Sequence, residues 1–466
     1  MKLYNTLSRQ IEEVKPLKGE ISLYTCGLTV YSQPHIGNWV AYIYWDILQR
    51  VLQAEGYNVK RVQNITDVGH LTSDEDAGED KMLKSALSEG TTAWEVAEKY
   101  IDIANHEAFE LLGLIKPEYL PRATNYIPQQ IEFVKQLEEK GYTYKIADGV
   151  YFDTSKLEDY GKLAQLDIAG LRFGARVADT GKKNPTDFAV WKFSSPNEKR
   201  DMEWDSPWGK GFPGWHLECS CMAREILGDQ IDIHTGGIDH IPVHHTNEIA
   251  QTEALTDKPF ASIWVHANHI KVNGTKMSKS LGNIYTLKDI TDKGFDLQAF
   301  KLMILSKHYR TEGNFTWEIL KASQNRLKKW HALADLKFQT QKIESSPAIK
   351  QIDWQQPQLF IKQQLADDLN TVEALIWLDR FSEDIEVLPQ GSLDSFQKLL
   401  EFMDSYFGLD LSNRLDITDE QKELIQKRTT AKDKGDFATA DALRQQLKKQ
   451  SVGLEDRATG TRWYRI

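Results

Sequence analysis

Short apolar runs and longer amphipathic stretches alternate along the first part of the chain. Runs of strand-like composition lie at residues 21–26, 58–65, 231–234 and 263–266, and a helical pattern occupies residues 39–53. Strands that alternate with helices predict a parallel sheet with crossover helices. We therefore expect an α/β fold built on a parallel sheet.

The pattern changes twice further along the chain. Between residues 117 and 200 charged residues become denser, Asp-Gly and Gly turns appear, and short strand-like runs such as 150–152 replace the helical stretches. Beyond residue 294 the period is helical over 295–306, 316–340 and 356–372, with apolar stripes and charged outer faces.

A passage rich in Ser, Asn and Asp at residues 411–419 predicts a linker, after which two basic helical stretches and a strand-like end follow. The chain is therefore expected to have four parts: a split α/β domain, an insertion, a helical domain and a small C-terminal domain. Their expected ranges are 1–116 with 201–294, 117–200, 295–410 and 418–466.

Composition narrows the class of protein. Of 466 residues, 41% are apolar and 27% are charged, and no apolar run approaches the roughly 18 residues of a membrane span. The cysteines Cys26, Cys219 and Cys221 are too few for a disulfide framework, so we expect a cytoplasmic protein without a membrane partner.

Charge is distributed unevenly. The net charge of −11 argues against a surface coated by nucleic acid. Residues 418–466, however, contain 11 Lys or Arg against 8 Asp or Glu, a local charge of +3. This segment is compatible with a local RNA-binding patch.

Two short strings carry candidate phosphate chemistry. His35-Ile36-Gly37-Asn38 follows a strand-like run and opens a helical pattern, where the helix N-terminus favours anions. Lys276-Met277-Ser278-Lys279-Ser280 places two ammonium groups three residues apart. Such a pair can neutralise the charge that builds on a pyrophosphate leaving group.

A second group of residues suits a metal ion. Cys26 ends a strand-like run, and Cys219 lies on a helical stretch that starts near residue 214. Glu248 follows His244 by four residues and His245 by three, so either imidazole can share a helix face with it. Two thiolates, an imidazole and a carboxylate form a plausible four-coordinate zinc set.

The competing interpretation of these cysteines is core packing, because free cysteine is among the most buried residue types. Packing is the preferred interpretation for Cys221. A metalloprotease is disfavoured, because the chain has no His-Glu-x-x-His helix.

Taken together, the motifs resemble those of the cysteinyl-tRNA synthetases, a family of class I aminoacyl-tRNA synthetases. The similarity spans essentially the whole chain, although Leu28 stands where the family more usually has Pro. It is carried by Cys-Gly-x-Thr-Val-Tyr at 26–31, His-Ile-Gly-Asn at 35–38, Asn-Ile-Thr-Asp at 64–67, Pro-Gly-Trp-His-Leu-Glu-Cys-Ser at 213–220, His-His-x-Asn-Glu at 244–248, Lys-Met-Ser-Lys-Ser-Leu-Gly-Asn at 276–283, Asp-Asp-Leu-Asn-Thr at 367–371 and Gly-Thr-Arg-Trp at 460–463.

The resemblance implies a Rossmann-type catalytic domain with a connective insertion, then a stem-contact and helical bundle domain and a small anticodon-binding domain. It implies a monomeric cysteine–tRNA ligase that activates L-cysteine with ATP to cysteinyl adenylate and releases pyrophosphate. Cysteine then passes to the 3′-terminal adenosine of tRNA(Cys), with the 2′-hydroxyl as nucleophile.

Roles for individual residues also follow from the resemblance. It implies that zinc is bound by Cys26, Cys219, His244 and Glu248, with His245 as a neighbour, and that the metal selects the substrate as a thiolate. It implies further that ATP, accompanied by Mg²⁺, is bound and activated by His35, Gly37, Asn38, Lys276 and Lys279, and that the substrate pocket contains Thr66, Trp215 and Asp239.

Two other functions stay open at this point. A ligase on the same core could pass cysteine to a small amine, although the C-terminal domain favours tRNA as the acceptor. A catalytically inactive RNA-binding relative is disfavoured by the intact His35, Asn38, Lys276 and Lys279. The acidic residues within 69–80 are interpreted as a solvated loop.

Overall fold

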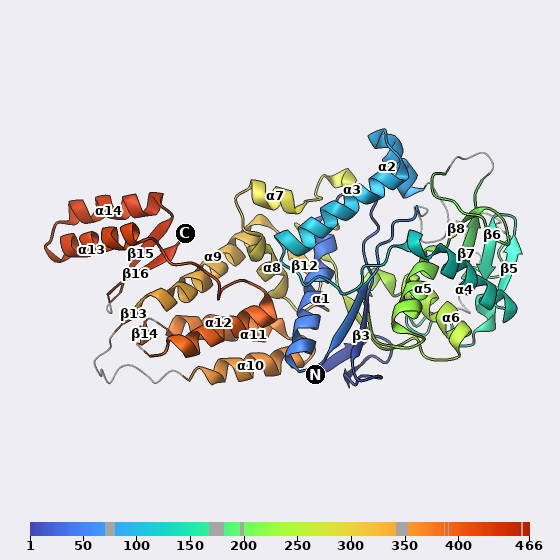
Figure 1. The fold of residues 1–466 in the computed structure, drawn as a ribbon, viewed down its shortest axis with the longest axis horizontal. Coiled ribbons are helices and arrows are strands. Elements are labelled where there is room, and N and C mark those ends of the chain that lie inside the picture. The colour runs from blue at the N-terminus through green and yellow to red at the C-terminus, as the bar shows by residue number, and fades with distance from the viewer. Residues whose placement is uncertain are drawn as a thin grey trace. The chain divides into compact units, whose positions relative to one another are not determined.

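A parallel sheet organises the first part of the chain in the computed structural model (Figure 1). Its strand order is β10-β9-β3-β4, and every neighbouring pair runs parallel. The strands are β3 (Ile21–Thr25), β4 (Val59–Gln63), β9 (Ile231–Gly237) and β10 (Ala261–Ala267). The α/β fold with a parallel sheet, predicted from the alternating pattern, is confirmed.

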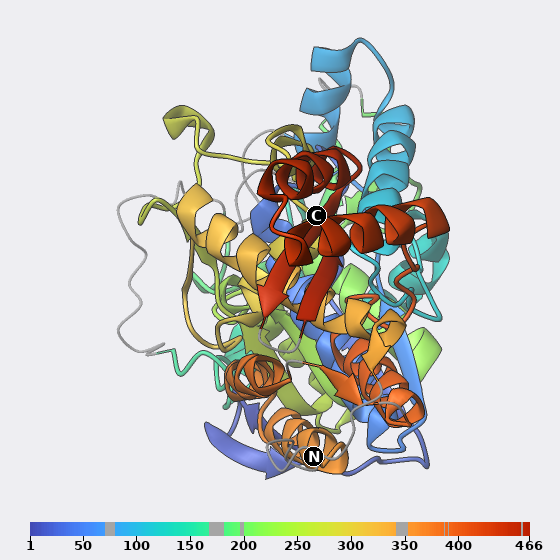
Figure 2. The same cartoon turned by 90° about the vertical axis from the view of Figure 1, so that its left-hand side faces the viewer.

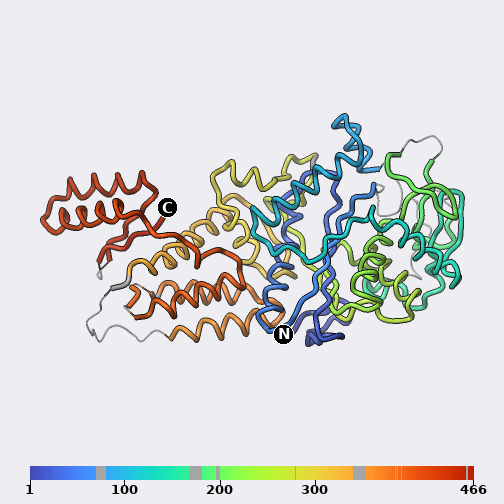
Figure 3. The backbone as a smooth tube through the Cα atoms, viewed as in Figure 1, coloured from blue at the N-terminus to red at the C-terminus, as the bar shows by residue number. Residues whose placement is uncertain are grey.

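The structure describes residues 1–69, 80–166, 181–195, 200–341, 353–385, 387–389, 391–457 and 460–466 (Figure 3). Two compact units divide these residues. The first contains Met1–Lys288 and Tyr309–Asn314, and the second contains Asp289–His308 and Phe315–Ile466. Most of the acidic stretch 69–80 lies outside the described residues.

Crossover helices complete the sheet of the first unit. Helix α1 (Ile36–Ala54) connects β3 to β4, and α6 (His244–Thr256) connects β9 to β10. Helix α5 (Trp215–Leu227) precedes β9 and packs against α6. Because β9 is buried along almost its whole length, its polar residues lie in the interior of the protein.

A hairpin and a short strand pair border this sheet. Strand β1 (Lys2–Asn5) pairs antiparallel with β2 (Gln10–Glu13), and β1 packs against β10. Strand β11 (Ile270–Val272) pairs with β12 (Gly313–Phe315).

The segment between β4 and β8 forms a helical part and a second sheet. The helices are α2 (Lys81–Glu89), α3 (Ala93–Asn105), a π-helical turn (His106–Leu111), two 3-10 turns (Ala123–Tyr126 and Thr154–Lys156) and α4 (Ile127–Glu139). The sheet is antiparallel, in the order β5 (Thr143–Ile146), β6 (Gly149–Phe152), β7 (Phe188–Phe193) and β8 (Gly211–Pro213). Its core includes Phe152 and Trp191, which are fully buried.

The second unit is mainly helical, as the sequence predicts. Its elements are α7 (Leu287–Asp292, which begins in the first unit), α8 (Leu297–Leu305), α9 (Trp317–Ala334), a 3-10 turn (Asp335–Phe338), α10 (Gln355–Ala366), α11 (Thr371–Asp384) and α12 (Leu393–Phe407), with the short strands β13 (Thr340–Gln341) and β14 (Leu388–Pro389). A small part follows with α13 (Asp419–Asp433), α14 (Phe437–Lys449), β15 (Val452–Arg457) and β16 (Gly460–Arg465).

Two predicted helices are wrong in their extent. The stretch 316–340 is helical only to Ala334, where α9 ends and a 3-10 turn follows. The stretch 356–372 is two helices, because α10 ends at Ala366 and α11 begins at Thr371. Asp368 and Leu369 adopt positive φ angles of 53° and 54°, which interrupt the helical path. The Asn370 side chain accepts a hydrogen bond from the Glu373 amide and so caps α11.

The C-terminal helices α13 and α14 pack on each other, and α14 packs on β15 of the hairpin (Figure 2), while β16 contacts α9 within the second unit. Trp463 is 6% exposed and stacks on Phe338, with ring centroids 6.3 Å apart. Its ring therefore belongs to the apolar core of this part of the chain. Leu411 and Ile417, in the expected linker, are also buried.

None of the helices in the described ranges is both long and apolar enough to cross a membrane.

Candidate active site and metal centre

A cavity of about 640 Å³ opens at the carboxyl edge of the parallel sheet. The residues that line it follow the ends of successive strands: Cys26 follows β3, Thr66 lies beyond β4, Asp239 follows β9 and Asn268 follows β10. Ligands of open parallel sheets commonly bind at this edge, because the loops that leave the strands meet there. The cavity is therefore the candidate active site.

Most of the residues expected to have functional roles line this single cavity. They are Cys26, His35, Gly37, Asn38, Thr66, Trp215, Cys219, Asp239, His244 and Lys276. Glu248 lies behind them and is fully buried. Lys279 begins a 3-10 turn (Lys279–Leu281), and its side chain lies outside what the structure describes.

Four of these residues form a compact group of metal-binding donors. The ligand atoms of Cys26, Cys219, His244 and Glu248 all lie within 4.8 Å of one another. Helix α6 places His244 one turn before Glu248, and His244 Nε2 lies 3.0 Å from Glu248 Oε1. Because all four residues are buried, a cation here would be bound by protein donors of the kind that zinc prefers.

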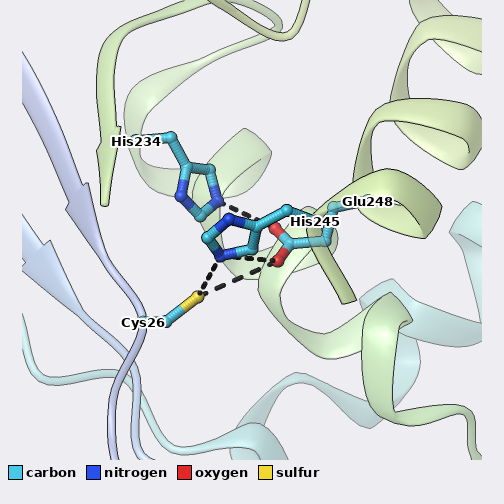
Figure 4. A group of neighbouring side chains, drawn as sticks. All are labelled: Cys26, His234, His245 and Glu248. Carbon is cyan, nitrogen blue, oxygen red and sulfur yellow. Dashed lines mark hydrogen bonds and ion pairs between the residues drawn. The ribbon is translucent and has the colours of Figure 1, made fainter. Parts of the chain in front are cut away.

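A second group shares Cys26 and Glu248 with the first (Figure 4). It substitutes His234 and His245 for Cys219 and His244. His245 Nε2 lies 3.3 Å from Cys26 Sγ, and His234 Nε2 lies 2.9 Å from Glu248 Oε2.

The two groups differ in how they face the cavity. In the first, Cys26, Cys219 and His244 line it. In the second, only Cys26 does, whereas His234 and His245 lie in the interior behind it. A cation in the first group would be accessible to a substrate in the cavity, and one in the second group would be largely sealed from it.

Burial and neighbouring charges shift the pKa values of the four donors in the first group. The hydrogen bond with Cys26 lowers the pKa of Cys219 to about 7, against the effect of burial. Burial opposes charge on His244, but Glu248 and Cys219 raise the pKa of His244 to about 10. Burial also opposes charge on Glu248, but His234 and His244 lower its pKa well below the ordinary value. Burial raises the pKa of Cys26 well above the ordinary value. Without a metal, the Glu248 carboxylate is therefore charged and paired with a protonated His244, and a cation would have to replace the protons of Cys26 and His244.

A cluster of buried histidines surrounds the donors, and the sequence interpretation missed it. His216 Nδ1 lies 2.9 Å from His244 Nδ1, and His245 Nδ1 lies 2.8 Å from His266 Nε2. Burial lowers the pKa of His245 and of His266 well below the ordinary value, so these imidazoles are neutral near pH 7. One sequence signal could have revealed the cluster: seven of the twelve histidines lie between residues 216 and 269.

The first turn of α1 contains the His-Ile-Gly-Asn string. Asn38 Oδ1 accepts a hydrogen bond from the His35 amide at 2.9 Å and so helps to form the helix start. The Ile36 amide donates to the Tyr285 carbonyl oxygen at 2.8 Å. Burial lowers the pKa of His35, so its imidazole is neutral near pH 7.

The three expected substrate-binding residues occupy different walls of the cavity. Trp215 packs on His244, with ring centroids 4.3 Å apart. Thr66 Oγ1 accepts a hydrogen bond from Asn64 Nδ2 at 3.0 Å. The Asp239 side chain is 60% exposed, and its Oδ1 atom lies 3.8 Å from His269 Nε2.

Comparison with known proteins identifies the family. The model of the tRNA synthetases class I (C) catalytic domain matches residues 12–325. A curated relative, cysteine–tRNA ligase 1 of Burkholderia lata, is 40% identical over 470 residues, which cover 99% of this chain and 96% of the relative. The chain belongs to the cysteine–tRNA ligases of class I. The family, the enzyme class and the ligase activity that the sequence motifs predict are therefore confirmed.

Two further proteins extend this comparison. The cysteine–tRNA ligase of Treponema denticola is 38% identical over 496 residues and is covered completely, as is this chain. The crystal structure of a ternary LeuRS–tRNA–LeuAMS complex of Agrobacterium radiobacter has a TM-score of 0.62 at 12% identity. The similarity covers 86% of this chain and 85% of that chain, and it shows that this ligase has the fold of class I synthetases.

Proposed function

We propose that this ligase activates L-cysteine with ATP to cysteinyl adenylate and transfers cysteine to the 3′-terminal adenosine of tRNA(Cys). One observation carries the proposal. A buried pair of thiols with an imidazole and a carboxylate opens into the same cavity as the His35–Asn38 turn and Lys276. A centre for a soft cation and a candidate nucleotide site are therefore within reach of one small substrate.

The metal in this proposal is one zinc ion bound by Cys26, Cys219, His244 and Glu248. The donor set fits, since thiolate, imidazole and carboxylate all suit zinc. This group is favoured over the one with His234 and His245 because three of its members line the cavity. When bound, zinc supplies a soft Lewis acid that accepts the thiolate of cysteine but offers a serine hydroxyl or an alanine methyl no equivalent bond.

Selection of cysteine is the physical problem that this arrangement solves. A small apolar pocket separates substrates that differ by one atom by only ~1–3 kcal/mol. Around the metal, Trp215 forms a wall of the cavity and packs on His244. The exposed carboxylate of Asp239 would pair with the substrate ammonium, and Thr66 would position the rest of the amino acid.

Activation requires positioning and charge neutralisation more than covalent help. The substrate carboxylate attacks the α-phosphate of ATP in line, and pyrophosphate leaves with Mg²⁺. His35 and Asn38 would hold phosphate or ribose oxygens, and Gly37 would let the nucleotide approach the backbone. Lys276 and Lys279 would neutralise the charge that develops on the leaving pyrophosphate.

The transfer step needs contacts with RNA. We assign residues 418–466 to the anticodon, the insertion 117–200 to the acceptor end and residues 295–410 to the stem of tRNA, in a monomeric, cytoplasmic enzyme. The local charge of +3 in 418–466 supports this assignment. In the C-terminal hairpin, Trp463 and Arg462 are buried. The candidates for contact are therefore exposed side chains of α13 and α14.

Pyrophosphate exchange tests the whole proposal. Exchange between ATP and pyrophosphate should depend on cysteine, be weak with serine or alanine, and proceed without tRNA. Transfer assays with tRNA(Cys) and with small amines then separate a tRNA ligase from a ligase that uses an amine acceptor. Cysteine-dependent exchange without transfer to tRNA would contradict the assigned acceptor, and the absence of exchange would contradict the activation step.

A further inference from the structure

The two candidate phosphate-binding segments contact each other through one pair of residues. A Cβ atom placed on Gly37 would lie 2.2 Å from the terminal methyl carbon of Met277, which is far closer than atoms can approach. The methyl group of Met277 therefore occupies the space that a side chain at position 37 would need. Both residues line the cavity.

The backbone does not require glycine at this position. Gly37 lies in the first turn of α1, with no positive φ angle that would favour glycine over other residues. The next nearest atoms to such a Cβ belong to the His35 ring, at 3.1 Å. The tightest restriction at position 37 thus comes from Met277.

Met277 belongs to a loop that is hydrogen-bonded internally. Asn283 Oδ1 accepts from the Ser278 amide at 2.8 Å, and Asn283 Nδ2 donates to Thr275 Oγ1 and to the Lys276 carbonyl oxygen, both at 3.2 Å. A displacement of Met277 would therefore carry its neighbour Lys276 with it.

A second contact joins the first turn of α1 to the chain that follows this loop. The Ile36 amide, at the start of α1, donates to the carbonyl oxygen of Tyr285 at 2.8 Å. This bond anchors the chain just after the loop, whereas Met277 contacts α1 near the beginning of the loop. The loop is thus held to the first turn of α1 from both sides.

We propose that Met277 is a positioning residue, whose methyl group packs on Gly37 and holds the Lys276–Lys279 loop against the first turn of α1. Glycine at position 37 then leaves space for the Met277 methyl group as well as for the nucleotide. Methionine suits the role, because its unbranched and polarisable side chain adapts to an irregular surface. For its catalytic consequence the inference rests on the proposed function, in which both segments act on ATP.

A double-mutant cycle tests the coupling through cysteine-dependent pyrophosphate exchange. Gly37→Ala should lower kcat/KM for ATP by about 100-fold, and Met277→Ala by about 10-fold, on the scale of lost positioning. The double variant should be at least about 5-fold more active than Gly37→Ala alone, because removal of the methionine relieves the clash. An equal loss from Gly37→Ala in both backgrounds would overturn the proposal.

Trypsin provides a readout that does not depend on catalysis. Without substrates, cleavage after Lys276 and Lys279 should be several-fold faster in Met277→Ala than in the unmodified chain. The double variant should be cleaved at the same rate as Met277→Ala. Leu281→Ala is the control, because Leu281 is 63% exposed in the same loop. Cleavage of Met277→Ala at the rate of this control would overturn the proposal.

The two assays separate the inference from the proposed function. Altered cleavage in a protein that shows no exchange would contradict the proposed activity and leave the loop contact supported. Normal exchange in the unmodified chain with neither coupling nor altered cleavage would contradict the loop contact alone.

Discussion

His234 Nε2 lies 2.9 Å from Glu248 Oε2, and both side chains are fully buried. The other carboxylate oxygen of Glu248, Oε1, lies 3.0 Å from His244 Nε2. Glu248 is thus fixed between two imidazoles, one of which lines the cavity while the other lies behind it. His234 orients the carboxylate that we propose as a zinc ligand.

Removal of His234 should therefore weaken metal binding without removing a proposed ligand. We expect His234→Asn to lower zinc affinity by about 10- to 100-fold, the usual effect of losing a group that orients a ligand. Competition with a chromogenic chelator measures the affinity. His269→Asn, a change of a half-exposed histidine at the cavity, is the control. An unchanged zinc affinity in His234→Asn would show that Glu248 does not depend on this contact.

The two thiols near Glu248 and the third cysteine should behave differently. Cys219→Ala should lose most of its zinc, because Cys219 lies in the donor group, whereas Cys221→Ala should retain the metal. Cys221 is the matched control, since it is also buried on α5 but packs in the apolar core beside the antiparallel sheet. Mass spectrometry of the two purified variants measures their zinc content per chain. Zinc loss from Cys221→Ala alone would show that the wrong thiol had been chosen.

Selectivity should depend on the metal more than on the shape of the pocket. We expect cysteine to support pyrophosphate exchange at least ~10⁴-fold better than serine, beyond the reach of apolar fit. Chelation should abolish exchange, and added zinc should restore it. A cysteine-to-serine ratio near ~10², with exchange surviving chelation, would make the metal structural only.

Asp335 connects three parts of the second unit. Its carboxylate accepts from Arg414 Nε at 2.7 Å and Nη2 at 3.0 Å, and from the Arg465 amide at 3.0 Å. Asp335→Ala should destabilise the unit by about 3–5 kcal/mol, because the largely buried guanidinium of Arg414 loses its ion-pair partner. Hydrogen exchange of β16 amides measures the change. The exposed Asp394→Ala is the control, and equal protection in both variants would contradict the assigned role.

Acid should weaken the second unit through His331. Burial, followed by the charge of Arg414, lowers the pKa of His331 to about 4 from its ordinary 6.5. Between these values the unfolded chain binds the proton and the folded chain does not. The contribution of His331 to stability is therefore complete above pH 6.5 and is lost as the pH falls towards 4.

His331→Gln should remove this part of the acid dependence, about 1–3 kcal/mol over that range. Denaturant midpoints between pH 4 and 7 measure it, with the exposed His106→Gln as control. Parallel curves for the unmodified chain and His331→Gln would exclude His331 as the source.

Much of the fold could be predicted from local patterns. Strands 21–26, 231–234 and 263–266 and most helices appear within a few residues of their expected ends, because period and composition act over short distances. The metal-binding residue types could also be named, since a spacing of four residues places His244 and Glu248 on one helix face. The break between α10 and α11 was missed, because it depends on the left-handed conformations of Asp368 and Leu369.

Only the tertiary structure decided which donors face the cavity. Both His244 and His245 can reach Glu248 from the same helix, so sequence spacing cannot choose between them. Cys26 and Cys219 lie close together because the end of β3 and helix α5 share one apolar cluster. Met277 lies beside Gly37 although the two residues are far apart in the chain. The sequence alone determined the local elements and the chemistry available to them. Long-range packing determined which of those groups meet and which are sealed from substrate, because burial and orientation depend on residues far away in the chain.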